Sequence, residues 1–91
     1  MEERLLAPDL YSYLVALASA LDNVAEADAA QQVLQVSKFA SGSTSELYGE
    51  ARLLLPQVLQ TNGARLSALE QARLRKVIAC IEREFARIGG A

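Results

Sequence analysis

The sequence predicts an all-α protein, arranged as a small antiparallel four-helix bundle or as two packed helical hairpins. Apolar side chains recur every three or four residues through most of the chain, which is the period of a helix with one buried face. Short polar turns separate four such segments, and no stretch alternates β-branched with polar residues as a half-buried strand does. At 91 residues the chain has the length of one small domain, so we expect residues 1–91 to share a single core.

Rows of aliphatic residues predict the first two helices. A helix over residues 8–22 begins with Pro8, which suits a first turn, and with Asp9, whose charge is favoured at the positive end of the helix dipole. Asp22 and Asn23 favour a turn, and a second helix is expected over residues 25–40. The rows are Leu10, Leu14, Leu17, Leu21 and Val24 in the first segment and Ala29, Val33, Val36 and Ala40 in the second.

The stretch FASGSTSELYGE, residues 39–50, interrupts this pattern with small and hydroxyl residues. Ser43 and Glu46 have the spacing of a capping box, in which the serine hydroxyl accepts a hydrogen bond from the backbone amide three residues on and the glutamate carboxylate reaches back to the serine. A third helix is therefore expected over residues 44–60. Pro56 lies inside it and removes the amide that would bond to the carbonyl of Arg52, so a bend or a break is expected there.

The same stretch has a second interpretation, as an anion site. Free amides at a helix start, together with the hydroxyls of residues 41–45, could surround a phosphate. The stretch lacks the glycine pattern and the lysine of a P-loop, however. Small and hydroxyl residues are also what a tight, capped turn between two helices requires, so we interpret the stretch as a structural corner.

The fourth helix is expected over residues 67–88 and is the longest. Asn62 and Gly63 suit a left-handed stop before it, and Ser67 with Glu70 repeats the capping-box spacing. At about 1.5 Å per residue this helix would be roughly 33 Å long. Its apolar row consists of Leu74, Ile78, Ile81, Phe85 and Ile88.

The composition narrows the classes of function. The chain has no histidine and a single cysteine, Cys80, so an internal disulfide and a multi-cysteine zinc site are excluded, and we expect neither a metal nor another cofactor. No two carboxylates have the spacing of a catalytic or metal-binding pair, and no small-molecule substrate is evident, so we expect a protein that is not an enzyme.

The sequence also predicts where the protein is found. Its start is acidic where a secretory signal is basic, and the uncharged stretch 10–21 is too short to cross a bilayer, which predicts a cytoplasmic protein without a membrane partner. The preference for arginine over lysine, with abundant alanine and leucine, is typical of bacterial proteins.

Charge is divided unevenly along the chain. Residues 1–50 contain eight acidic and two basic residues, a net charge of −6, whereas residues 51–91 contain seven basic and three acidic residues, a net charge of +4. The two halves should attract each other within one molecule or between copies. Exposed ion pairs contribute only about 0 to 1 kcal/mol each, so this attraction favours an orientation more than it stabilises a fold.

A row of basic side chains follows one face of the last predicted helix. We call the four residues Arg73, Lys76, Arg83 and Arg87 the basic row; Cys80 lies within it. Three interpretations are open: a solvated face, a docking surface for an acidic helix or subunit, and a nucleic-acid contact. The acidic net charge and the lack of an aromatic residue in the row count against nucleic acid. Nearby positive charge favours a thiolate, but without a base or a second cysteine we interpret Cys80 as a small, partly buried residue.

A second feature of the last helix suggests self-association. Ala72, Ala79 and Ala86 recur every seven residues, and small side chains allow another helix to approach closely. On the first helix Tyr11, Tyr13 and Val15 lie outside the leucine row. Together these faces suggest a homodimer or a partner groove, unless the core of so small a domain uses them all.

These observations predict a non-catalytic helical module for protein–protein interaction, an adaptor, a regulator or an inhibitor of a partner, that associates with itself. The alternative prediction is a protein that binds nucleic acid or another anionic ligand through the basic row. The protein partner is the first expectation because the composition supports a surplus of apolar surface: 52% of the residues are hydrophobic.

Overall fold

The computed structural model describes residues 4–88, which form four α-helices, two short 3-10 helices and no strand. The predicted all-α class is confirmed. The helices are α1 (Ala7–Asn23), α2 (Ala27–Ser37), α3 (Thr44–Asn62) and α4 (Ala68–Arg87); the 3-10 helix η1 (Lys38–Ser41) follows α2 directly, and η2 (Gly63–Arg65) follows α3 directly.

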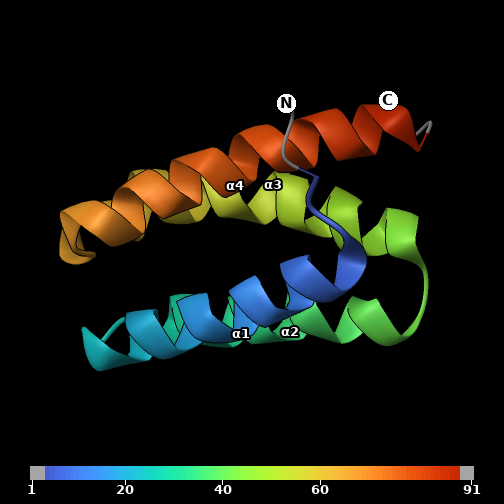
Figure 1. The fold of residues 1–91 in the computed structure, drawn as a ribbon. Coiled ribbons are helices and arrows are strands. Elements are labelled where there is room, and N and C mark those ends of the chain that lie inside the picture. The colour runs from blue at the N-terminus through green and yellow to red at the C-terminus, as the bar shows by residue number, and fades with distance from the viewer. Residues whose placement is uncertain (1–3, 89–91) are drawn as a thin grey trace.

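The helices are arranged as two antiparallel hairpins in two layers, α1 with α2 and α3 with α4 (Figure 1). Backbones approach each other most extensively within each hairpin, and α2 against α3 is the main backbone contact between the layers. Of the two arrangements that the sequence allows, packed hairpins is therefore the closer description.

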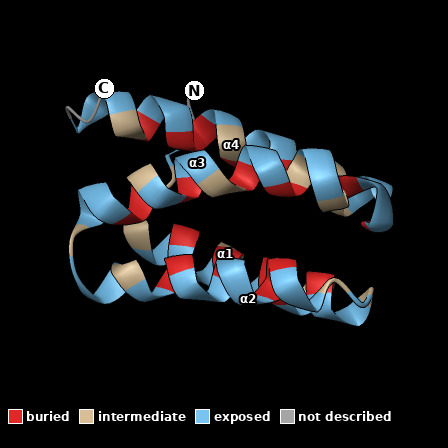
Figure 2. Ribbon diagram, turned by 180° about the vertical axis from the view of Figure 1, so that it is seen from behind, coloured by how far each residue is buried: buried red, intermediate tan, exposed pale blue. Residues whose placement is uncertain are grey.

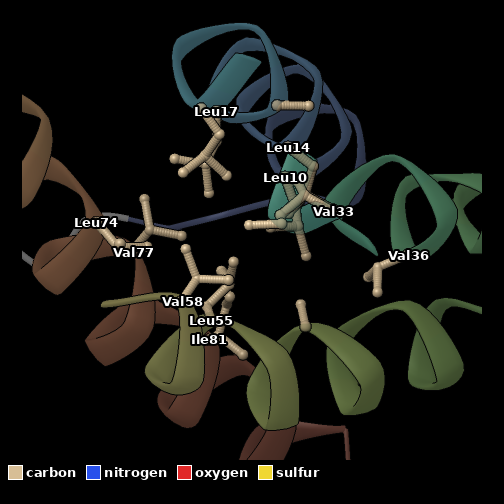
Figure 3. Close-up of a cluster of buried hydrophobic side chains, with 14 of the residues drawn as sticks. Leu10, Leu14, Leu17, Val33, Val36, Leu55, Val58, Leu74, Val77 and Ile81 are labelled. Carbon is tan, nitrogen blue, oxygen red and sulfur yellow. The ribbon is translucent and has the colours of Figure 1, made fainter. Parts of the chain in front are cut away.

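The core lies between the two hairpins, and all four helices contribute buried residues to it (Figure 2). The leucine row of α1 is fully buried from Leu10 to Leu21, and it meets Val33 of α2, Leu55 of α3 and Ile81 of α4 (Figure 3). Burying one such side chain stabilises the fold by about 1.5 to 3 kcal/mol. The interior is almost entirely aliphatic, as the composition predicts.

The second helix is shorter than predicted at both ends. Ala25 has a left-handed backbone, with φ of 64°, so residues 25 and 26 belong to the turn and α2 begins at Ala27. At the other end the Ser37 hydroxyl donates to the carbonyl of Leu34 at 2.6 Å, and the chain tightens into η1. Ala40 therefore lies outside α2 and is exposed rather than continuing the apolar row.

At the starts of α3 and α4 the serine half of the predicted capping box is present, whereas no bond from either glutamate back to its serine amide is seen among residues 4–88. The Ser43 hydroxyl accepts a hydrogen bond from the Glu46 amide at 3.3 Å, and the Ser67 hydroxyl accepts one from the Glu70 amide at 3.1 Å. Pro56 does not break α3, which runs as one helix from Thr44 to Asn62. Pro56 is exposed, so the backbone group that it leaves without a partner lies on the solvent side.

The predicted left-handed stop at Gly63 is wrong. Gly63 has right-handed helical angles, φ −60° and ψ −34°, and begins η2. Gly63 packs closely against the preceding turn: a Cβ atom there would lie 3.2 Å from Cδ1 of Leu59, so a larger residue would require the Leu59 side chain to shift slightly. The chain leaves the helical conformation only at Leu66, whose backbone is extended.

Polar contacts tie the two hairpins together at both ends. At one end the Glu26 carboxylate accepts a hydrogen bond from the side-chain amide of Asn62 at 3.0 Å and lies 3.6 Å from the Arg65 guanidinium. At the other end the Tyr48 hydroxyl donates to the carbonyl of Leu5, and Arg4 binds Glu84. The Glu26–Arg65 pair follows the expected attraction of an acidic first half for a basic second half, whereas the Arg4–Glu84 pair reverses it.

Candidate binding groove

A groove of about 460 Å³ lies between α1 and α4 and opens to solvent on one side. Its apolar wall comes from the start of the chain, from α1 and from α4, and three cationic side chains lie along it. We call it the α1–α4 groove; it is lined by Leu5, Tyr13, Leu69, Ala72, Val77 and Cys80, and by the cations Arg4, Arg73 and Lys76.

The groove exists because one of the four helix seams is incompletely packed. The α1–α2 and α3–α4 pairs make extensive close backbone contacts and the α2–α3 pair makes fewer, whereas α1 and α4 are not among the closely packed pairs. Side chains therefore have to fill the space between them. Tyr13 from α1 and Val77 from α4 occupy it, and the remaining volume is the groove.

Tyr13 is the most unusual side chain in this wall. Its hydroxyl oxygen is buried and has no hydrogen-bond partner among residues 4–88. Burial raises the pKa of this hydroxyl well above its ordinary value, the nearby charge of Glu70 raises it further, and Arg73 opposes the rise. The hydroxyl therefore stays protonated, and within residues 4–88 its donor has no acceptor.

The structure divides the predicted basic row into two pairs. Arg73 and Lys76 are exposed and line the α1–α4 groove. Arg83 donates to the sulfur of Cys80 at 3.3 Å, and the guanidinium of Arg87 lies 3.7 Å from the carboxylate of Glu84. The row is thus not one uniform surface of four equivalent cations.

Cys80 lies between the two pairs along α4. It is only 6% exposed and forms part of the groove wall. Its thiol is the single sulfur nucleophile of the chain. Contact with Arg83 and burial against the helix interface give it a packing position, in agreement with the interpretation of Cys80 as a small buried residue.

The sequence identified Tyr11, Tyr13 and Val15 as apolar residues outside the leucine row, and the structure places them on two different sides of α1. Tyr13 lines the α1–α4 groove, whereas Tyr11 and Val15 lie on the other side of α1, facing α2 and solvent. Successive odd positions in a helix lie about 200° apart, which separates Tyr13 from its two neighbours. Of the three alanines that recur every seven residues on α4, only Ala72 lines the groove, while Ala79 and Ala86 are exposed outside it.

Sequence reasoning missed the contribution of Arg4, Leu5 and Leu69 to this groove. Leu69 carried a signal, since it is an apolar residue off the buried row of α4, and it is 68% exposed. Arg4 and Leu5 carried none, because periodicity within one helix does not tell which helix the preceding segment will contact.

Two other kinds of site considered from the sequence are an anion site in the corner of residues 39–50 and a metal site. In the corner of residues 39–50, Ser41 donates to the carbonyl of Lys38, while Ser43 caps α3 and lies 3.0 Å from the hydroxyl of Ser45. These hydroxyls form local contacts of the kind that a structural corner requires. Within residues 4–88 there is no group of three or more side chains placed to hold a metal ion.

Every helix in the described part of the chain is too short or too polar to cross a membrane. Comparisons of the chain with protein-family models, with curated proteins and with solved structures found no match.

Proposed function

We propose that this protein is a non-catalytic interaction module whose α1–α4 groove binds an amphipathic, acidic helix of a partner protein. The observation that carries the proposal is the incompletely packed seam: an apolar wall open to solvent, with cations beside it. A helix from another chain would complete the bundle there, in the way that amphipathic helices fill hydrophobic grooves in other recognition domains.

The apolar part of the groove supplies the driving force in this proposal. Leu69 is 68% exposed and Ala72 is also exposed, whereas Val77 and Cys80, which continue the groove lining along α4, are already largely buried. An arriving row of leucines would remove this surface from water, which is worth about 25 cal/mol for each Å² of apolar area. The span from residue 69 to residue 80 is about 17 Å long, enough for roughly three helical turns of a partner.

The charges supply orientation and selectivity. Arg73 and Lys76 lie beside the apolar wall, so glutamates or aspartates flanking the partner's apolar row would meet them. A basic partner would be repelled. Nucleic acid is the less favoured ligand, because Arg83 and Arg87 already contact Cys80 and Glu84 and the wall between the cations is apolar.

The proposal is tested with a synthetic probe. A labelled helical peptide of about 14 residues, roughly 21 Å long, carries a leucine row flanked by glutamates, and a second peptide has lysines in place of the glutamates. We expect fluorescence anisotropy to show binding of the acidic peptide, weaker binding of the basic one, and little binding of a DNA duplex with the same label.

Variants of exposed groove residues give the matched controls. Leu69→Glu and Ala72→Glu should each weaken binding of the acidic peptide by about tenfold, equivalent to about 1.4 kcal/mol. Leu53→Glu changes an equally exposed leucine on α3 outside the groove and should leave binding unchanged. Equal binding of both peptides, equal loss with Leu53→Glu, or tighter binding of DNA with a steep salt dependence would each contradict the proposal.

A further inference from the structure

The outer face of the first hairpin carries apolar side chains that the fold does not cover. We call it the α1–α2 outer face. Tyr11, Val15 and Leu34 are 46%, 39% and 37% exposed there. Two shallow hollows of about 510 and 360 Å³ adjoin along the seam between the helices, and both are lined by Val15, Gln31 and Leu34.

Opposite charges lie at the two ends of this face. The hollow that contains Tyr11 is lined at its far end by Lys38, and the hollow toward the α1–α2 turn is lined by Asp22. No ion pair within residues 4–88 involves Asp22 or Lys38. The face therefore has a cation at one end, an apolar centre and an anion at the other end.

A two-fold axis matches this arrangement to itself. Rotation by half a turn about an axis through the apolar centre places the Lys38 end of one copy on the Asp22 end of the other, and it forms both ion pairs at once. The ridge formed by Val15 and Leu34 then lies against a hollow of the partner copy. We propose that the α1–α2 outer face binds a second copy of this chain in an antiparallel, isologous dimer in which Lys38 of each copy faces Asp22 of the other.

The size of the face sets the expected strength of the dimer. A pair of packed helices about 25 Å long and 20 Å wide presents roughly 500 Å² in projection, so the two copies bury on the order of 1,000 Å². This area lies below the usual range for specific, stable protein interfaces, which is about 1,200 to 2,000 Å², and is typical of weak or transient ones. We therefore expect a weak dimer with a dissociation constant in the micromolar range.

This inference is independent of the groove proposed above. The α1–α4 groove and the α1–α2 outer face share no lining residue, and they lie on different sides of α1. A protein that binds the peptide but stays monomeric, or one that dimerises but does not bind the peptide, would therefore contradict only one of the two proposals.

The test is sedimentation equilibrium from about 5 to 500 μM protein, a range chosen to span micromolar dissociation constants. The unchanged chain should dimerise reversibly, and Leu34→Glu should weaken dimerisation at least about tenfold because it places a charge in the apolar centre. Far-UV circular dichroism checks that this exposed position does not alter the fold.

Charge exchange tests the symmetry. Lys38→Glu and Asp22→Lys should each associate less tightly than the unchanged chain, because like charges then face each other. An equimolar mixture of the two should form a heterodimer more tightly than either associates with itself, and the double variant should again dimerise as a homodimer. Asp28→Lys makes the same charge change on an exposed residue that lines neither hollow, and it should leave the dimer unchanged.

The outcomes that overturn the inference are distinct. A monomer over the whole concentration range removes the dimer. A dimer that survives Leu34→Glu but is lost with Ala72→Glu places self-association in the α1–α4 groove instead. A mixture of the two charge variants that is no tighter than the separate variants, or an effect of Asp28→Lys as large as that of Asp22→Lys, excludes the two-fold pairing.

Discussion

Glu84 is the only buried charged side chain among residues 4–88. Its carboxylate accepts two hydrogen bonds from Arg4, at 2.7 and 3.1 Å, and Arg87 lies 3.7 Å away. These contacts join the start of the chain to α4. The hydrogen bond from Arg4 is the main cause that lowers the pKa of Glu84 below its ordinary value of 4.5, while burial acts in the opposite direction.

The lowered pKa predicts a pH dependence of stability. As the pH falls, the unfolded chain takes up a proton at this carboxyl before the folded protein does, so the contribution of Glu84 is present above pH 4.5 and is lost as the pH falls through the lower folded value. We expect Glu84→Gln to lower the urea midpoint at pH 7 and to have a smaller effect at pH 3. Glu82→Gln, at an exposed carboxylate paired with Arg52, is the control and should change little at either pH. Equal losses at pH 7 and pH 3 for Glu84→Gln would contradict the expected linkage.

At the residue scale the sequence predicted which side chains are apolar and helical but not which of them meet. The four members of the basic row share a helix face, as their spacing requires. Their environments differ because Arg83 contacts Cys80, Arg87 contacts Glu84, and Arg73 and Lys76 border the groove. Cys80 and Glu84 lie three positions earlier on α4 itself, whereas the groove beside Arg73 and Lys76 is lined partly by the segment before α1, which no periodicity within α4 can reveal.

At the element scale the sequence predicted helix starts better than helix ends. Ser43 and Ser67 mark the starts of α3 and α4 because a side-chain cap is a local interaction, complete within four residues. The turn before α2 depends on Ala25 in a left-handed conformation that alanine rarely adopts, so its residue type gives no signal. Gly63 suggested such a conformation but has right-handed helical angles.

The caps can be tested directly. Ser43→Ala and Ser67→Ala each leave a backbone amide without its side-chain acceptor, and each should lower the free energy of unfolding by about 0.5 to 2 kcal/mol. Ser12→Ala changes an exposed serine inside α1 and should be neutral or slightly stabilising, because alanine is the better helix former. Urea denaturation compares the three. If both cap variants were as stable as the Ser12 variant, the hydrogen bonds at the helix starts would not contribute.

At the scale of the whole molecule, stability depends on aliphatic side chains that the two hairpins contribute to one interior. Leu14 and Ile81 are fully buried on opposite hairpins. Leu14→Ala or Ile81→Ala should lower the free energy of unfolding by about 2 to 5 kcal/mol, a large share of the stability of a small domain. Leu53→Ala, at a largely exposed leucine, should change it by no more than about 0.5 kcal/mol. Small losses at both buried sites, measured by chemical denaturation, would show that the interior tolerates cavities that close packing forbids.

The arrangement of the helices was predictable only in part. Four amphipathic segments with short turns require antiparallel neighbours along the chain, and both hairpins follow from this. Which seam stays open depends on side-chain volumes across helices that are distant in sequence. Tyr13 and Val77 lie between α1 and α4, and the groove beside them could be located only once the two hairpins were placed against each other.

The short segment before α1 has a practical consequence for handling this protein. Arg4 and Leu5 form part of the groove wall. Arg4 binds the buried carboxylate of Glu84, and the Leu5 carbonyl accepts a hydrogen bond from the hydroxyl of Tyr48. A version trimmed to begin at Ala7 would therefore lose one side of the groove and would also leave an anion inside the protein without its main counter-ion. Removing this segment, although it lies outside the helices, would therefore disturb both recognition and folding. An affinity tag placed after α4 would leave the groove wall, the Arg4–Glu84 pair and the Leu5–Tyr48 hydrogen bond in place.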